Sequence, residues 1–257
     1  MSARVLLTGL LAMAAMAIGP LAFAQSRTPS GHPDLSGYWT QNDKVPVDAA
    51  LMGRLPANTV VVHDTGLIEL PRGDFGGLKL KPSAAEAARK WDPRADLAID
   101  KVCSPPSIIY AMQGPFPMEV YQGTELIVFK LEYYDMVRVI FMDGRGHPPK
   151  DAPHSKVGHS IGHWEGDVLV VDTDHLEAAT ITNNGLSHTQ DAHVIERFRL
   201  SPDGKALLST QEFEDPAVLD NRGARFIGWT KVPGQYVNAY DCDPSFGLNY
   251  GAPGAAK

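Results

Sequence analysis

The sequence has little of what many specialised classes of protein require. It contains only two cysteines, Cys103 and Cys242, too few for a scaffold held together by several disulfides. The 23 Lys and Arg residues are outnumbered by 30 Asp and Glu residues, and no basic run occurs, so we expect no nucleic-acid partner. There is no Walker A sequence, no G-x-G-x-x-G fingerprint and no flavin or pyridoxal phosphate signature, and we expect no cofactor. With 44% hydrophobic residues, the chain still has enough apolar material for a core.

The first 24 residues have the pattern of a secretory signal peptide. Arg4 provides a positive charge, residues 5–18 are apolar, and an A-x-A cleavage site lies at 22–24. This apolar run is shorter than the ~20 residues that a spanning helix needs, so no membrane partner is expected. The pattern predicts a periplasmic or secreted protein in an oxidising compartment. There the two cysteines would form a disulfide, with two buried free thiols as the alternative.

The rest of the chain divides into a loop-rich region at 25–101 and a strand-rich region at 102–257, within one domain overall. The first region contains one convincing helix at 83–91, where Ser83 and Glu86 have the spacing of a capping box. The second alternates apolar and polar residues between turn signals, which predicts an all-β barrel or sandwich. A turn at 34–39 leads into a first strand, and further strands are expected at 59–63, 108–112, 118–122, 125–132, 136–142, 159–164, 168–171, 179–182, 192–200, 206–213 and 225–231.

Two charged residues interrupt otherwise apolar strand faces. Glu196 is the charged member of one face of the strand at 192–200, and Arg138 is the polar member of one face of the strand at 136–142. We expect both side chains to be buried, where they could pair between neighbouring strands. The pair is either a structural ion pair or part of a polar cluster that binds or acts on a ligand inside the barrel.

Histidine is concentrated in one stretch, because seven of the nine histidines lie between His147 and His193. An imidazole titrates near neutral pH, so at least one of them is expected to take part in acid–base chemistry. His159 and His163 have the spacing of a zinc pair on a helix, but the glycines around them favour a strand. On a strand they would lie roughly 13 Å apart. No metal ligand is therefore predicted, although a site assembled across several strands stays open.

The segment 158–162 matches G-x-S-x-G, in which Ser160 would be the nucleophile of a serine hydrolase. That motif needs a buried strand before it and a helix after it. Here the preceding residues 153–157 do not read as a buried strand, and a turn and an apolar strand follow. The context therefore disfavours a serine hydrolase.

Three longer segments form a set, namely 138–148, 158–173 with the sequence GHSIGHWEGDVLVVDT, and 188–198, and the segments at 34–39 and 103–105 fit with them. Together they resemble a large family of secreted bacterial proteins of mostly unassigned function, over most of the chain after the leader. The resemblance implies a calycin- or lipocalin-like antiparallel β-barrel with one short N-terminal helix. It draws attention to five matching polar positions, Arg138, His159, His188, His193 and Glu196.

Our leading hypothesis is a cofactor-independent lyase or isomerase that acts by proton transfer on a small apolar molecule. His159 would be the general acid or base, His188 or His193 its partner, and Glu196 would orient them. Arg138 would stabilise negative charge that develops on the substrate or hold a substrate oxygen. Since some members of the family act in the breakdown of plant-derived aromatic compounds, the resemblance implies an aromatic, plant- or lignin-derived substrate.

Four further residues are expected to bind the substrate. Tyr110, Tyr121 and Trp164 would line a ligand cavity, as aromatic side chains do in small barrels, and His147, in the tight turn at 143–148, would overhang its mouth. The segment 183–185 stands where relatives carry a longer insertion, which would alter the rim of the pocket. The first alternative is a non-catalytic, lipocalin-like binder of hydrophobic small molecules, and the second is a metal-dependent hydrolase. The expected partner is a small hydrophobic or aromatic ligand, and association into a homo-oligomer is left open.

Overall fold

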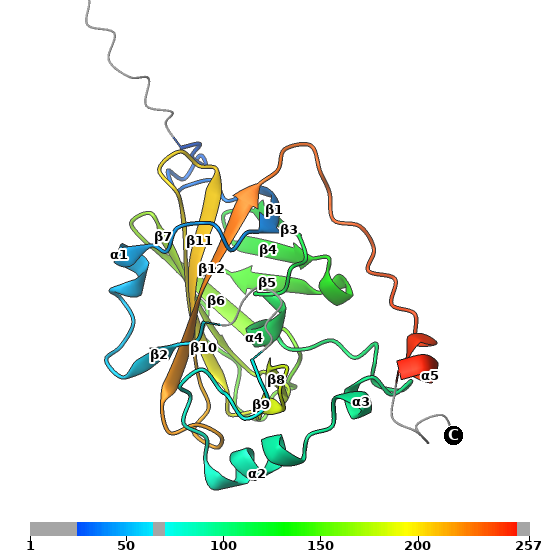
Figure 1. Ribbon diagram of the computed structural model, residues 1–257. Coiled ribbons are helices and arrows are strands. Elements are labelled where there is room, and N and C mark those ends of the chain that lie inside the picture. Colours follow the sequence, from blue (N-terminus) through cyan, green and yellow to red (C-terminus); the bar gives the residue numbers. More distant parts are fainter. Residues whose placement is uncertain (1–24, 64–69, 251–257) are drawn as a thin grey trace, which may run out of the picture.

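The computed structural model describes residues 25–63 and 70–250, and its centre is a β-barrel (Figure 1). The predicted signal peptide, at 1–24, lies outside the described residues. Nine of the described strands follow one another around the barrel, and the last pairs again with the first, so the prediction of an all-β barrel is confirmed. In barrel order they are β1 (Gly37–Gln41), β3 (Met118–Gln122), β4 (Leu126–Leu131), β5 (Val137–Phe141), β6 (His159–Glu165), β7 (Val168–Asp174), β10 (His193–Leu200), β11 (Ala206–Glu214) and β12 (Arg222–Lys231).

The barrel strands pair antiparallel, except that β5 and β6 run parallel over two residue pairs, Ile140 with Ser160 and Phe141 with Ile161. A parallel pair cannot be joined by a tight turn, and here the connection occupies residues 142–158. Two smaller pieces of β structure lie outside the ring. β2 (Thr59–Val61) pairs in parallel with the start of β12, and β8 (Ala179–Thr182) forms a hairpin with β9 (Leu186–His188).

The interior of the barrel is packed with large side chains. Alternate residues of β10 are buried, as the period-two pattern predicts, and the other strands contribute aromatic residues to the same core. Phe129 and Phe198, for example, pack edge to face with ring centres 5.2 Å apart. Five aromatic side chains are each no more than 1% exposed: Trp39, Phe129, Phe198, Phe213 and Trp229.

One end of the barrel holds a short buried helix, α4 (Ile108–Ala111), where the sequence predicted a strand at 108–112. Two polar side chains from the barrel fix it, because Gln211 donates to the carbonyl of Ile108 at 3.2 Å and Arg225 donates to that of Ile109 at 3.3 Å. The strand prediction was wrong because so short an apolar run has no periodicity that separates a strand from a buried helical turn.

The other helices of the described chain lie outside the barrel: α1 (Ala49–Met52), α2 (Pro82–Lys90), α3 (Pro93–Asp96), the 3₁₀ turn η1 (Tyr133–Asp135) and α5 (Phe246–Tyr250). α2 is the predicted helix, but the predicted capping box is not formed. The residue before α2 is Lys81, which makes no side-chain cap, and Pro82 occupies the first turn. Proline suits that position because its φ is already helical and it lacks the N–H that would need a partner. None of the described helices is long and apolar enough to cross a membrane.

Cys103 and Cys242 form the predicted disulfide, with Cα atoms 5.8 Å apart. The bond joins the loop before α4 to the segment that follows β12, so it ties the C-terminal part of the chain to the barrel end. The loop-rich region at 25–101 is also joined to the barrel, because β1 pairs with both β3 and β12 and completes the ring.

Candidate functional site

The five residues predicted to be catalytic lie in three separate places. Arg138 and Glu196 meet inside the barrel. His159, at the start of β6, and His193, at the start of β10, lie on its outer wall. His188 is the last residue of the β8–β9 hairpin. Each place has its own geometry and its own chemistry.

Inside the barrel, Arg138 Nη2 and Glu196 Oε2 are 2.5 Å apart, and both side chains are fully buried. The burial and the pairing agree with the prediction, but the strands are not neighbours, because β6 and β7 separate β5 from β10. Arg138 also donates to Ser160 Oγ at 3.0 Å and to Thr173 Oγ1 at 2.8 Å, and Glu196 accepts from Gln211 at 3.2 Å. A pair that is sealed from solvent and held by several neutral partners has the geometry of a structural ion pair.

His188 is buried at 2% exposure. Its Nδ1 donates to the carbonyl of Thr189 at 2.8 Å, which leaves Nε2 to accept from the hydroxyl of Ser107 at 2.7 Å. Burial lowers the pKa of His188, so its imidazole is neutral at pH 7. The hydrogen-bond partners of His188 within the described residues are thus Ser107 and Thr189, and not His159 or His193.

The outer wall carries a group of imidazoles and carboxylates that we call the His–Asp cluster: His147, His159, Asp172, Asp174 and His193. His159 begins β6 and faces Asp174 at the end of β7. His147, from the 142–158 connection, places Nδ1 2.7 Å from Asp174 Oδ1 and 2.9 Å from His159 Nδ1. Asp172 Oδ1 lies 3.2 Å from His147 Nε2 and 2.7 Å from His193 Nε2. The structure thus joins three of the predicted site residues through two carboxylates.

The members of this cluster differ in charge. Burial, and the neighbouring His147, lower the pKa of His159, which therefore keeps a neutral ring at pH 7. A hydrogen bond to Asp172 raises the pKa of His193. Burial alone would raise the pKa of Asp172, but the hydrogen bonds from His193 and His147 outweigh burial and lower it. The cluster thus combines a neutral imidazole with an ionised carboxylate, which can accept a proton or bind a cation.

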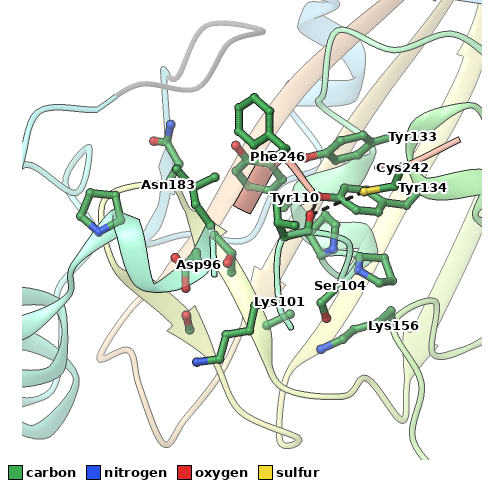
Figure 2. Close-up of a pocket in the computed structure, with 18 of the residues that line it drawn as sticks. Asp96, Lys101, Ser104, Tyr110, Tyr133, Tyr134, Lys156, Asn183, Cys242 and Phe246 are labelled. Carbon is green, nitrogen blue, oxygen red and sulfur yellow. Dashed lines mark hydrogen bonds between the residues drawn. The ribbon is translucent and has the colours of Figure 1, made fainter. Parts of the chain in front are cut away.

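A cleft of about 1000 Å³ lies beside α4, and we call it the tyrosine cleft (Figure 2). Its walls come from α3 and the loop that follows, α4, η1, the β8–β9 hairpin and the segment around Cys242. Six aromatic residues line it: Trp91, Tyr110, Tyr133, Tyr134, Tyr240 and Phe246. The disulfide holds two of these walls together.

Three of the tyrosines pack on one another. Ring centres are 4.7 Å apart for Tyr133 and Tyr134 and 4.6 Å apart for Tyr134 and Tyr240, and the hydroxyl of Tyr134 donates to the carbonyl of Val102 at 2.9 Å. Burial raises the pKa of Tyr134 to about 12 and that of Tyr133 still further, and it also raises the pKa of Tyr240. All three side chains are therefore neutral phenols at pH 7.

Charged and polar residues occupy other sides of the cleft. Figure 2 shows Tyr133 and Tyr134 together on one side, Asp96 and Asn183 across from them, and Lys101 and Lys156 along a further edge. Lys156 donates to the carbonyl of Ala178 at 2.8 Å. The cleft therefore combines an aromatic wall with both donors and acceptors at its rim.

The four residues predicted to bind substrate do not come together. Tyr110 lines the tyrosine cleft, and His147 belongs to the His–Asp cluster. Tyr121 is on β3 with 52% of its surface exposed, and it does not line the cleft. Trp164 stacks on His32 with ring centres 4.7 Å apart. The single predicted cavity is thus replaced by two distinct candidate sites.

Several important residues were missed at the sequence level. Tyr133 and Tyr134 are adjacent and Tyr240 lies two residues before Cys242, so the expected disulfide could have placed Tyr240 near the Cys103 loop. Asp172 and Asp174 alternate along one strand, a spacing that puts both on the same face. The spacing of the two aspartates does not say which residues pack against that face of the strand.

Scans against protein-family models, curated proteins and solved structures found no match to this chain. A function must therefore be inferred from the chain's own geometry.

Proposed function

We propose that this protein is a binding protein that holds a small, hydroxylated aromatic molecule in the tyrosine cleft. The observation that carries the proposal is the lining, in which four tyrosines, a tryptophan and a phenylalanine border a volume of about 1000 Å³. That volume is at the upper end of the range for small-molecule sites. Aromatic rings gain from offset or edge-on contact with one another, so such a lining favours an aromatic ligand over an alkyl chain of similar size.

The polar groups of the cleft narrow the ligand class. Tyr133, Tyr134 and Tyr240 are neutral phenols. The hydroxyl of Tyr134 already donates to Val102, so it can accept from a ligand hydroxyl, whereas those of Tyr133 and Tyr240 can donate to or accept from a ligand hydroxyl or methoxy group. Lys101 and Asp96 lie on other sides of the cleft and can bond to polar groups at the far end of the same ligand. A substituted phenol with a short polar side chain satisfies these partners together.

Binding without catalysis is favoured by the places that the predicted catalytic residues occupy. A general acid or base must come within hydrogen-bond reach of a substrate atom, and its partner must be positioned with it. Arg138 and Glu196 are sealed inside the barrel, and His188 is buried against Ser107. Of the described residues that line the tyrosine cleft, none is a histidine.

We place this binding function outside the cytoplasm. The leader-like pattern at 1–24 supports export, and the disulfide between Cys103 and Cys242 is the kind of bond that persists in an oxidising compartment. A binder located there would meet small aromatic molecules before they enter the cell.

The proposal is tested by isothermal titration calorimetry on the chain that begins at Gln25. 4-(3-Hydroxypropyl)phenol is the aromatic probe, and 4-(3-hydroxypropyl)cyclohexanol, which has the same carbon skeleton and the same two hydroxyls, is the saturated control. We expect one aromatic molecule per chain with a Kd below about 100 µM, which corresponds to about −5.5 kcal/mol, and at least tenfold weaker binding of the control. Chromatography after the titration should recover the probe unchanged.

Variants locate the binding. Tyr134→Leu and Tyr110→Leu each remove an aromatic face from the cleft, and each should weaken binding by about 2- to 10-fold, the value of one aromatic contact. Tyr121→Leu is the matched control, because Tyr121 is exposed on β3, and it should bind as the wild type does. Equal effects of all three variants, equal affinity for the saturated alcohol, or conversion of the probe would each overturn the proposal.

A further inference from the structure

A potential metal site lies on the outer wall of the barrel and shares no residue with the lining of the tyrosine cleft. Of the described residues, only His147, His159 and Asp174 bring three metal-ligating atoms within 4.8 Å of one another. All three side chains are half-buried, with exposed fractions of 19% for His147 and 31% for Asp174. The site is thus shielded by the protein on one side and open to water on the other.

The fold determines this convergence. His159 and Asp174 are paired in register where β6 begins and β7 ends, so their side chains project from the same face of the wall. The parallel junction of β5 with β6 requires the long 142–158 connection, which brings His147 over that pair. The three ligands therefore come from two strands and a loop, a combination that no short sequence motif would reveal.

The contact between the two imidazoles is the most informative detail. Their Nδ1 atoms are 2.9 Å apart, and His147 Nδ1 is also 2.7 Å from Asp174 Oδ1. Two ring nitrogens approach so closely only when a proton lies between them or when both direct lone pairs at one cation. Asp174 Oδ1 also accepts from His175 Nδ1 at 2.6 Å, and a carboxylate oxygen has a second lone pair with which it can ligate a cation while it keeps that bond.

Asp172 contacts the ring nitrogen of His147 that faces away from the proposed metal. Its Oδ1 accepts from His147 Nε2 at 3.2 Å, and it also accepts from His193 at 2.7 Å. A carboxylate on the far nitrogen of a histidine fixes the orientation and tautomer of that ring, which is the arrangement that commonly accompanies a metal-bound histidine. Asp172 is thus a positioning residue for His147.

We propose that His147, His159 and Asp174 bind one divalent transition-metal ion of the zinc class, with water in the remaining position. Two imidazoles and one carboxylate are a ligand set that zinc accepts in sites with an open position. Tetrahedral bonds of about 2.0–2.1 Å place neighbouring ligand atoms about 3.3 Å apart, so the present spacing needs to open by about half an ångström. Small rotations of the side chains provide that change.

The test uses the chain from Gln25 without a histidine tag, stripped with EDTA and then dialysed. Titration calorimetry with Zn²⁺ should show one ion per chain with a Kd below about 1 µM, and Zn²⁺ should raise the Tm. His159→Gln and Asp174→Asn should each weaken Zn²⁺ binding at least about 100-fold. Asp172→Asn should keep one ion per chain and weaken its binding about 10- to 100-fold, as loss of a supporting carboxylate does.

His163→Gln is the matched control, because His163 lies on the same strand with 62% of its side chain exposed. It should leave the affinity within about twofold of wild type. Circular dichroism of the metal-free variants checks that they are folded, and His147→Gln serves if either of the first two is not. Absence of stoichiometric binding to the wild type would overturn the proposal, as would wild-type affinity in a folded His147, His159 or Asp174 variant.

Discussion

At the scale of single residues, His188 gives the clearest pH dependence. Burial lowers the pKa of His188 below the usual value near 6.5, and Nε2 of the neutral ring accepts a hydrogen bond from the hydroxyl of Ser107. The unfolded chain therefore takes up a proton at His188 more readily than the folded chain does. The stability that this residue contributes is present above about pH 6.5 and declines as the pH falls below that value.

We predict that His188→Gln removes the part of the pH dependence of stability that comes from the buried imidazole. The free energy of unfolding of the wild type minus that of the variant should fall between pH 7.5 and 5.5, by at most about 1.4 kcal/mol per pH unit. His175 and His193, whose pKa values are raised, change stability in the opposite direction, but both proteins contain them and their effects cancel. Urea unfolding at three pH values measures the difference, and a constant difference would contradict a buried neutral His188.

The burial of single charged residues could be predicted from the sequence, but their contacts across strands could not. The burial of Arg138 and Glu196 could be predicted, because each is a charged residue on an apolar strand face. Their positions around the barrel could not, because alternation along a strand says nothing about which strands are neighbours. The contact of His147 with His159 was hidden for the same reason, since it depends on the parallel junction of β5 and β6.

At the scale of elements, β6 explains the apparent hydrolase motif. Ser160 is a buried partner of Arg138, and a Cβ at Gly162 would lie 2.6 Å from Met142 Sδ and 2.8 Å from Ile140 Cγ2. Gly158 has a φ of +65°, and a Cβ there would lie 2.5 Å from the carbonyl oxygen of Asp174. The glycines and the serine of G-x-S-x-G therefore meet packing requirements of the barrel wall.

We predict that Gly158→Ala is far more destabilising than Gly204→Ala. Both glycines have positive φ, +65° and +69°, so each substitution carries a backbone cost of about 1–2 kcal/mol. A Cβ at Gly204 meets nothing within 4 Å, whereas one at Gly158 collides with backbone that must move. The collision should add about 1–3 kcal/mol, measured by urea unfolding. If the two variants lose the same free energy of unfolding, a Cβ at Gly158 does not collide with the backbone of Asp174.

Strands could be predicted where the residues of the strand itself alternate between apolar and polar and turn residues flank them. The strand at 118–122 matches β3, and that at 179–182 matches β8, because alternation and flanking turns are local signals. α4 was mistaken for a strand, and β9, which has three residues, was not predicted. Both are too short to show a period and are fixed by partners from distant parts of the chain, such as Gln211 and Ser107.

At the scale of the whole molecule, β1 pairs with β12 and closes the barrel, and hydrogen bonds and a disulfide attach the segment after β12 to the outside of the barrel. Backbone N–H groups of this segment donate to three carboxylates, from Val237 to Glu119 at 3.2 Å, from Asn238 to Glu132 at 2.9 Å and from Tyr240 to Asp135 at 3.1 Å. The disulfide adds a covalent attachment across 139 residues of sequence. The tyrosine cleft depends on this attachment, because Tyr240 and Phe246 belong to the fastened segment.

We therefore predict that the double variant Cys103→Ser/Cys242→Ser keeps the barrel but loosens the tyrosine cleft. Loss of a bond that closes so long a loop should lower the free energy of unfolding by about 2–5 kcal/mol. Hydrogen exchange should become faster in residues 233–245, while amides of β10 and β11 should stay the slowest to exchange, because their ladders lie within the closed ring. Binding of the aromatic probe should weaken and Zn²⁺ binding should not, since the His–Asp cluster lies on other strands. If exchange in residues 233–245 is unchanged, the three carboxylates alone hold the segment and the disulfide does not shape the cleft.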